Sequence, residues 1–309
     1  MSRIREIVYR ACALAVGLLV AAAHAAVAQD LTPLRFGISA PSIAGINRTD
    51  ATASLKVWIE TIGREHQVPV DANPRIIDRL EDFAAALDRG EIDVLTASAG
   101  EFLELERVAP LASLFSTTAG GTATEEYVVL VRADSPHRDL ADLRGARLLK
   151  LVHPSASLAP IWLEVELARA NLPEPSGFFR DIVTEDKVNR VILPVFFGRA
   201  DACLVTRRGF ATVGELNPQV AKQLRVLASS PPLIPNITSH RRDIPETLAQ
   251  AYRRAALSLA DTPAGRQVLN LFQNDGFVEI SEQDLAPTRA LLAERARLSA
   301  GSDGREGAP

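Results

Sequence analysis

Two serines in the segment 153–157 are the side chains best placed to do chemistry. This segment joins a predicted strand at Leu148–Val152 to the helix that follows it, and it contains Ser155 and Ser157. The first amides of a helix have no internal partner, and the helix dipole favours an anion beside them. The serine hydroxyls add further donors, so the segment predicts an anion site. A purely structural role as helix caps, worth about 1 kcal/mol each, stays open.

Two more serines stand at the ends of predicted strands. Ser39 follows the strand at Leu34–Ile38, and Ser98 follows the strand at Ile92–Thr96. In an open α/β sheet, ligands bind beyond the carboxyl ends of the strands. We therefore expect Ser39 and Ser98 to face the same cleft as the serines of segment 153–157.

Asp201 is a candidate for a different contact, because it begins the predicted strand at Ala200–Val205. A carboxylate there would receive an amino group of the ligand, and a surface turn residue is the alternative. The sequence does not place Asp201 relative to Glu185 and Asp186.

Residue patterns typical of catalysis are missing from the sequence. It contains no phosphate-binding loop, no Gly-x-Gly-x-x-Gly and no Gly-x-Ser-x-Gly, and His66, His137, His153 and His240 lack metal-ligand spacing. We therefore predict a binding protein with no catalytic residues, no metal and no cofactor. An enzyme on the same scaffold is the competing class, and it would need a carboxylate pair with an ordered histidine.

The first 28 residues have the pattern of an export signal. Basic residues up to Arg10 precede the uncharged run Ala11–Ala23, and Ala26-Val27-Ala28 offers small residues for cleavage. This pattern predicts a signal peptide over 1–28, a mature start at Gln29 and a periplasmic location. An uncleaved membrane anchor is the alternative.

Charge and cysteine content narrow the partners. Removal of the signal takes away three Arg and one Glu, which changes the formal net charge from −4 to −6. A mildly acidic chain argues against nucleic acid and anionic membranes as partners. Cys203 is the only cysteine left, so no internal disulfide can form, and its apolar surroundings predict an inert buried thiol.

Strands and helices alternate along the chain, which predicts an α/β fold with mostly parallel sheets flanked by helices. Breaks at Gly120-Gly121 and near Pro231 bracket a middle block, which suggests a lobe inserted into another lobe. The small polar end of the chain is typical of a disordered tail. The predicted boundaries are 32–121 with 232–298 for lobe I, 122–231 for lobe II and 299–309 for the tail.

The order of these elements resembles that of a known family over about residues 34–292. The resemblance is carried by several short motifs: Leu34–Ile38, Leu87–Val94, Ser135–Gly145, Phe197–Ala202 and Pro232–Pro235. It is a resemblance to the periplasmic solute-binding proteins of the phosphate, phosphite and phosphonate transport family. That family implies two lobes joined by two crossover segments and closing on a small anionic or zwitterionic solute, such as a phosphonate- or phosphate-like oxyanion.

The resemblance also implies partners and site residues. The partner would be the membrane permease of an ABC transporter, or, as an alternative, a periplasmic sensor domain, and we expect a monomer. The phosphonate group of the family lies at a Ser-Thr-Ser-Gly helix start, which matches Ser155, Ala156, Ser157 and Leu158 here. Two of these four positions differ, which removes one hydroxyl donor and narrows the approach to the backbone. Phe102 stands where the family usually has an aromatic hydroxyl.

Overall fold

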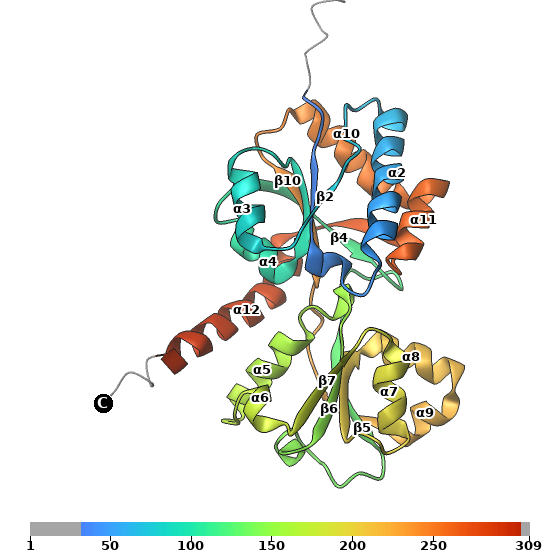
Figure 1. Ribbon diagram of the computed structural model, residues 1–309, viewed down its shortest axis with the longest axis vertical. Helices are drawn as coiled ribbons and strands as arrows, with labels where there is room; N and C mark the ends of the chain where they lie inside the picture. The colour runs from blue at the N-terminus through green and yellow to red at the C-terminus, as the bar shows by residue number, and fades with distance from the viewer. Residues whose placement is uncertain (1–31, 304–309) are drawn as a thin grey trace, which may run out of the picture. The chain divides into compact units, whose positions relative to one another are not determined.

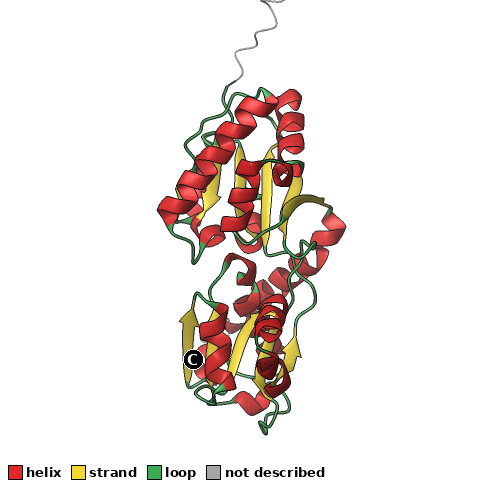
Figure 2. Cartoon of the chain, turned by 90° about the vertical axis from the view of Figure 1, so that its right-hand side faces the viewer, coloured by secondary structure: helices red, strands yellow, loops and turns green. Residues whose placement is uncertain are grey.

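The computed structural model describes residues 32–303, and the predicted signal peptide lies outside them. In the described chain, the strands form two separate sheets with helices on both faces (Figures 1 and 2). We call the six-stranded sheet with its helices the first lobe, and the five-stranded sheet with its helices the second lobe.

The first lobe has the strand order β11-β4-β10-β3-β1-β2. Helices α3 and α4 cover one face of this sheet, and α2, α10 and α11 cover the other (Figure 1). The strands are β1 Phe36–Ser39, β2 Arg75–Ile77, β3 Val94–Ser98, β4 Leu111–Thr118, β10 Asn236–Arg241 and β11 Gly276–Ile280. The helices are η1 Ala40–Ile43, α2 Arg48–His66, α3 Leu80–Asp88, α4 Ala99–Leu105, α10 Glu246–Leu257, η4 Leu259–Asp261 and α11 Pro263–Leu271, where η marks a short 3₁₀ turn.

The second lobe has the strand order β7-β6-β8-β5-β9. Helices α5 and α6 lie on one face, and α7, α8 and α9 on the other (Figure 1). The strands are β5 Tyr127–Arg132, β6 Arg147–Leu151, β7 Asp181–Glu185, β8 Ala202–Thr206 and β9 Leu224–Ser229. The helices are η2 Ala141–Leu143, η3 Pro154–Ala156, α5 Ala159–Arg169, α6 Pro175–Phe178, α7 Val188–Phe196, α8 Arg207–Leu216 and α9 Pro218–Gln223.

Both sheets contain parallel and antiparallel strand pairs. The alternation of strands and helices along the sequence predicts mostly parallel sheets instead. In the first lobe β1 pairs in parallel with β2 and β3, but β10 runs antiparallel to β3 and β4. In the second lobe β5 runs antiparallel to both β8 and β9. The reason is that the chain leaves the first lobe after β4 and returns before β10. These two passes lie side by side in opposite directions, with Glu125 bridged to Leu233.

The central strands of the second lobe are buried on both faces, which explains their unbroken apolar sequences. Residues Tyr127–Val131 of β5 and Ala202–Val205 of β8 are all at most 1% exposed. Such strands have no polar face, as expected beneath two layers of helix. Cys203 is buried among them, as predicted, and burial raises the pKa of its thiol.

The C-terminal helix α12, Glu282–Asp303, links the two lobes. It packs against α4 of the first lobe and α5 of the second. On the second lobe, Arg169 binds Glu294 at 2.6 Å and Arg295 binds Glu164 at 2.8 Å. The tail predicted to be disordered from residue 299 is therefore helical as far as Asp303, and residues 304–309 lie outside the described chain.

The start of α10 has no side-chain cap, although the local sequence offers one. Asp243 and Glu246 have the spacing of a capping box, but the helix begins at Glu246 after Pro245, without a side-chain cap. Asp243 instead forms an ion pair with Arg241, so the carboxylate is drawn to a guanidinium on the preceding strand.

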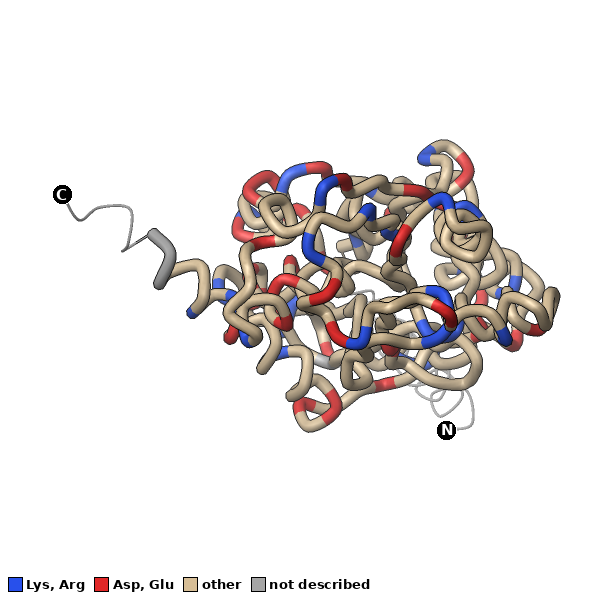
Figure 3. Tube along the Cα trace, turned by 90° about the horizontal axis from the view of Figure 1, so that it is seen from below, with Lys and Arg blue, Asp and Glu red and all other residues tan. Residues whose placement is uncertain are grey.

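The surface of the described chain carries charges of both signs. Basic and acidic residues are interspersed along the trace, without a basic stripe (Figure 3). None of the helices in residues 32–303 combines the length and the apolar character needed to cross a membrane.

Candidate functional site

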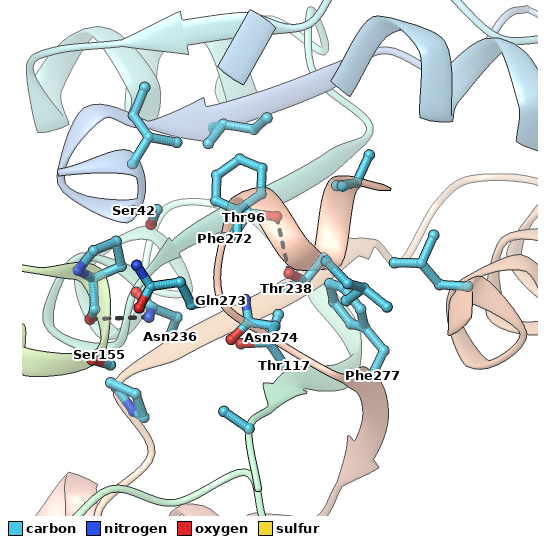
Figure 4. Close-up of a pocket in the computed structure, with 18 of the residues that line it drawn as sticks. Ser42, Thr96, Thr117, Ser155, Asn236, Thr238, Phe272, Gln273, Asn274 and Phe277 are labelled. Atoms are coloured by element: carbon cyan, nitrogen blue, oxygen red, sulfur yellow. Dashed lines mark hydrogen bonds between the residues drawn. The ribbon is translucent and has the colours of Figure 1, made fainter. Parts of the chain in front are cut away.

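A cavity of about 100 Å³ is lined by residues of both lobes and of the segments that join them. The first lobe contributes Ser42 from η1, Thr96 from β3, Thr117 from β4 and Thr238 from β10. The second lobe contributes His153, Pro154, Ser155 and Arg208. Asn236 is the first residue of β10, and Glu125 comes from a segment that joins the lobes. Figure 4 shows ten of the lining side chains by label around this space.

Hydroxyl groups of the first lobe supply neutral donors and acceptors to the cavity. The Thr96 and Thr238 hydroxyls lie 2.9 Å apart, across the antiparallel pair β3 and β10 (Figure 4). The Ser42 hydroxyl is held 2.9 Å from that of Ser39. Hydroxyls rotate to donate or accept, so this wall can adapt to either role in a ligand.

His153 and Ser155 form a unit at the end of β6. The Ser155 backbone N–H donates to His153 Nδ1 at 3.2 Å, and the Ser155 hydroxyl lies 2.8 Å from the same nitrogen. Because Nδ1 accepts, the hydrogen of the neutral ring is on Nε2. Burial, with the positive charges of Arg208 and Lys187, lowers the pKa of His153 to about 4. The histidine is therefore neutral at pH 7.

Two hydrogen bonds connect the lobes beside this unit. Asn236 Nδ2 donates to the Pro154 carbonyl at 3.1 Å, and the Ser157 hydroxyl donates to the Pro235 carbonyl at 3.0 Å (Figure 4 draws the first). Among the described residues, buried Asn236 Oδ1 has no hydrogen-bond partner. A buried acceptor without a donor is costly, so this oxygen is suited to an N–H or O–H group of a ligand.

The charged groups of the cavity are a pair, buried Glu125 and partly exposed Arg208. The Arg208 guanidinium donates to the Glu125 carboxylate, whose residue is 6% exposed. Burial raises the pKa of Glu125 to about 7, although the Arg208 charge opposes that shift. Nearby Asp275 has a lowered pKa because it accepts hydrogen bonds from the Thr118 hydroxyl and from Gly121 N. The site therefore offers one cation and one carboxylate that is poised to bind or release a proton.

The remaining walls of the cavity are apolar and belong to the first lobe. They come from β1, α2, α10, α11 and their neighbours, and the set is Phe36, Ile38, Ile43, Leu55, Trp58, Ile59, Val94, Tyr252, Leu259, Val268, Leu269, Phe272 and Phe277. The aromatic rings contact one another, with Phe36 and Trp58 at 6.1 Å and Phe36 and Tyr252 at 6.3 Å between ring centroids.

The structure brings one of the sequence-predicted site residues, Ser155, to the cavity wall. Its neighbour Ala156 is 3% exposed and lies outside the cavity lining. Ser157 also lies outside the lining, because its hydroxyl donates a hydrogen bond to the Pro235 carbonyl. Ser39 does not line the cavity, and its hydroxyl contacts that of Ser42, which does. Ser98 caps α4 in a capping box with Glu101.

Asp201 lies at the opposite end of the second sheet from His153. Its carboxylate accepts from Arg147 N at 2.7 Å, where β6 begins, whereas His153 follows the end of β6. It thus holds two strand starts together. Glu185 and Asp186 lie outside the cavity lining and are near Arg190.

Sequence reasoning missed Glu125, Arg208 and Asn236. A signal existed for Arg208, because it follows the carboxyl end of β8, the strand that Asp201 precedes. No local pattern marks Glu125 or Asn236, since their place depends on the two passes of chain between the lobes. Groups of three or more metal-binding side chains are absent from residues 32–303.

Comparisons with known proteins place this fold. No curated protein matches the sequence significantly. Among solved structures, the protein XAC2383 from Xanthomonas citri bound to ATP has a TM-score of 0.64 at 18% identity, covering 87% of this chain and 99% of that one. A binding protein component of a Pseudomonas aeruginosa ABC phosphonate transporter has a TM-score of 0.59 at 16% identity, covering 88% and 89%.

A third structure, PhnD1 from Prochlorococcus marinus in complex with methylphosphonate, has a TM-score of 0.58 at 12% identity, covering 84% of this chain and 97% of that one. At these identities the structures share the two-lobed fold. The family assignment comes from the sequence, because residues 46–285 match the family model described as ABC transporter, phosphonate, periplasmic substrate-binding protein. The chain therefore belongs to the periplasmic substrate-binding proteins of phosphonate ABC transporters.

Proposed function

We propose that this protein binds a small anionic or zwitterionic solute in the cavity between its lobes and delivers it to the permease of an ABC transporter. The observation that carries the proposal is the pair Arg208 and Glu125 in the cavity wall, because it offers a partner for each sign of charge. Neutral donors and acceptors surround the pair, including the Thr96–Thr238 hydroxyls and Asn236.

Substitution of Arg208 tests the proposal. Calorimetry would use inorganic phosphate, methylphosphonate and aminomethylphosphonate as probes, so that anions and a zwitterion are compared. Loss of a charge-assisted hydrogen bond costs about 1.5–3 kcal/mol of binding free energy. Arg208→Gln should therefore lower the affinity for the probes that bind by about 10- to 100-fold. Arg207→Gln is the matched control, because Arg207 binds Glu126 and Ser229 and does not line the cavity. Equal affinities in the two variants would refute a role for Arg208.

We also propose that the solute holds the lobes together. Asn236 and Ser157 already bridge the lobes beside the cavity, and a solute that contacts both sides would favour the closed arrangement by its differential affinity. Small-angle scattering of a monomeric sample should give a smaller radius of gyration with saturating probe than without it. An unchanged radius would contradict closure.

The export step is part of the same proposal. The family is periplasmic, and the basic start, apolar run and Ala26-Val27-Ala28 support cleavage after Ala28. Intact-mass analysis of the periplasmic fraction should give a chain that starts at Gln29. Recovery of the protein with residues 1–28 in the membrane fraction would overturn this part.

A further inference from the structure

Glu125 is held at the cavity wall by the segment that joins the lobes. Its backbone N–H donates to the Leu233 carbonyl at 2.8 Å, and its carbonyl accepts from Leu233 N at 2.9 Å. Each pass of chain between the lobes therefore fixes the other at this point. The Glu125 side chain is 7% exposed, so bulk water hardly solvates its carboxylate. Protein groups must compensate the charge whenever this carboxylate is ionised.

The Glu125 carboxylate has little support from hydrogen-bond donors. Among the described residues, Arg208 is its only donor, and it donates from a single nitrogen. The carboxylate of Asp275 is better supplied, because it accepts from the Thr118 hydroxyl and from Gly121 N. These donors lower the pKa of Asp275, whereas burial raises the pKa of Glu125 to about 7. A buried carboxylate that loses its last donor becomes neutral by taking up a proton.

The Arg208 guanidinium has room for a second partner. Its side chain is 36% exposed, and it lines the cavity. A guanidinium carries several N–H donors in a fixed fork, and in the part of the chain that the structure describes Glu125 is its only acceptor. An anionic solute in the cavity would compete with Glu125 for this guanidinium. A zwitterionic solute can place its ammonium group against the carboxylate, so the competition applies to solutes that carry only negative charge.

The charges around the pair oppose an anion as long as Glu125 is ionised. The described lining has one Arg or Lys side chain, Arg208, and one Asp or Glu side chain, Glu125. Their charges cancel, and the nearby Asp275 carboxylate, which interacts with Arg208, adds a further negative charge. A proton on Glu125 removes one of the two negative charges and leaves the Arg208 guanidinium to the solute.

Two other titratable groups near the pair are neutral at pH 7. His153 lies near the Arg208 charge, and burial lowers its pKa to about 4. Burial, with the charge of Glu125, raises the pKa of the Tyr127 hydroxyl. Charged Lys187 lies outside the described lining, as does Glu126, which pairs with Arg207. Glu125 is therefore the lining group that takes up a proton near neutral pH when an anion enters.

We propose, on the basis of the proposed function, that Glu125 competes with anionic solutes for Arg208, so that binding of an anion is coupled to the uptake of one proton. The guanidinium transfers its hydrogen bond from the Glu125 carboxylate to the solute. The carboxylate stays buried and takes its proton from water or buffer. Glu125 thereby determines how the affinity depends on pH, and anions bind more tightly at acidic than at alkaline pH.

Calorimetry of the full mature chain between pH 6 and pH 9 tests this inference. The probes are methylphosphonate and methanesulfonate, whose charge is fixed in this range, each in two buffers of different ionisation enthalpy. The enthalpy difference between the buffers gives the number of protons taken up. At pH 8 the wild-type protein should take up about one proton, and above pH 7 its affinity for methanesulfonate should fall by up to about tenfold per pH unit.

Glu125→Gln removes the titrating group and keeps the shape of the side chain. It should take up no proton with methanesulfonate, and at pH 9 it should bind both probes more tightly than wild type. Methylphosphonate itself titrates near neutral pH, so for this probe the count is the difference between wild type and variant. Glu126→Gln is the matched control, because Glu126 pairs with Arg207 outside the described lining, and it should keep the wild-type proton uptake.

Carboxyl NMR of the wild-type protein covers the case in which Glu125→Gln does not fold. With ¹³C-labelled glutamate, a carboxyl resonance should titrate near pH 7 without solute. A saturating concentration of either probe should raise the midpoint of that titration, because the bound form holds the proton. A midpoint that does not move at saturation overturns the inference.

The outcomes separate this inference from the proposed function. If the probes bind wild type and Glu125→Gln with equal affinity and equal proton uptake across the range, the inference is overturned and the proposed function stands. If neither probe binds either protein at any of these pH values, the proposed function fails and the inference fails with it. Proton uptake that is present in wild type and Glu126→Gln but absent in Glu125→Gln supports both.

Discussion

Removal of the titrating group of His153 should change how the stability of the protein depends on pH. The histidine is buried, and the Ser155 N–H and hydroxyl surround its Nδ1. Protonation of Nδ1 would break the contact with the amide and place a charge near Arg208. His153→Asn keeps an acceptor at the position of Nδ1 and abolishes the titration, so it isolates this effect.

The expected magnitude follows from the pKa of His153, which burial lowers from 6.5 to about 4. A base with a lowered pKa contributes stability above its unfolded pKa and loses it as the pH falls to the folded pKa. One pKa unit corresponds to 1.36 kcal/mol, so the wild-type protein should lose about 3 kcal/mol from this group between pH 7 and pH 4. Relative to wild type, His153→Asn should therefore gain about 3 kcal/mol over the same interval.

Glu125 acts in the opposite direction and provides the matched variant. Burial raises its pKa from 4.5 to about 7, so its stabilising contribution is complete below pH 4.5 and is lost as the pH rises through 7. The two effects partly cancel in the wild-type protein. Glu125→Gln should consequently lose stability relative to wild type on acidification, whereas His153→Asn gains it.

Urea denaturation of the three proteins at pH 7, 6, 5 and 4 provides the assay. The free energy of unfolding, taken by linear extrapolation, should diverge for the two variants as the pH falls. Protonation of the many surface carboxylates at low pH lowers the free energy of unfolding of all three proteins alike. Subtracting the wild-type value from that of each variant removes this shared contribution. If the free energy of unfolding of His153→Asn stays parallel to that of wild type across the whole range, the reasoning about His153 is refuted.

Three further predictions follow from single positions. Cys203 is fully buried and its thiol pKa is raised, so a thiol reagent at pH 8 should label it only as fast as the protein unfolds; rapid labelling of the folded chain would contradict this. Gly265→Ala places a methyl group against the Leu259 carbonyl, and it should lower the free energy of unfolding by about 1–3 kcal/mol in denaturation experiments. The control Gly177→Ala should be nearly neutral, because the nearest atom to its new methyl group would be 3.8 Å away. Asp201→Asn should leave the calorimetric affinity for methylphosphonate unchanged, because Asp201 lies at the far end of the second sheet; a tenfold loss would place it in the site.

The parts of the fold that the sequence predicts are those with local causes. The uninterrupted apolar sequence of strand β5, Tyr127–Arg132, is typical of a strand buried on both faces, and its first five residues are buried in a row. Gly90 indicates the end of α3 because glycine readily adopts the positive φ, here 64°, that often follows a helix. These features depend on a few neighbouring residues, so a single sequence contains them.

Strand β10 had no such signal, although it lies inside the first sheet. Thr238, Ser239 and His240 are buried but polar, and their hydrogen bonds go to distant residues or to the adjacent backbone. A polar segment of this kind looks like a surface loop until the strands on both sides are known. Helix α12 lacks a clear sequence signal for another reason, because its apolar positions do not form a regular stripe.

The candidate site was predictable to the extent that it follows strand ends. The end of β6 gave Ser155, and the equivalent end of β8 would have given Arg208. Ser39 and Ser98 also follow strand ends, but their hydroxyls are engaged by Ser42 and Glu101 instead of lining the cavity. The pairing of Glu125 with Arg208 joins residues far apart in sequence, and only the fold brings them together.

Helix α12 has a consequence for the apparent affinity of the protein. It is attached to the first lobe through Thr288 and Arg289, which contact Ile234 and Glu106, while its ion pairs with Arg169 and Glu164 lie on the second lobe. If the lobes separate without solute, these two pairs break. Exposed pairs contribute about 0.2–1 kcal/mol each, which changes the ratio of closed to open molecules by about 2- to 30-fold. If the lobes close on the solute as proposed, only the closed fraction binds with full strength, and α12 then sets part of the dissociation constant from outside the cavity. Salt that screens its ion pairs should in that case raise the dissociation constant even for an uncharged solute.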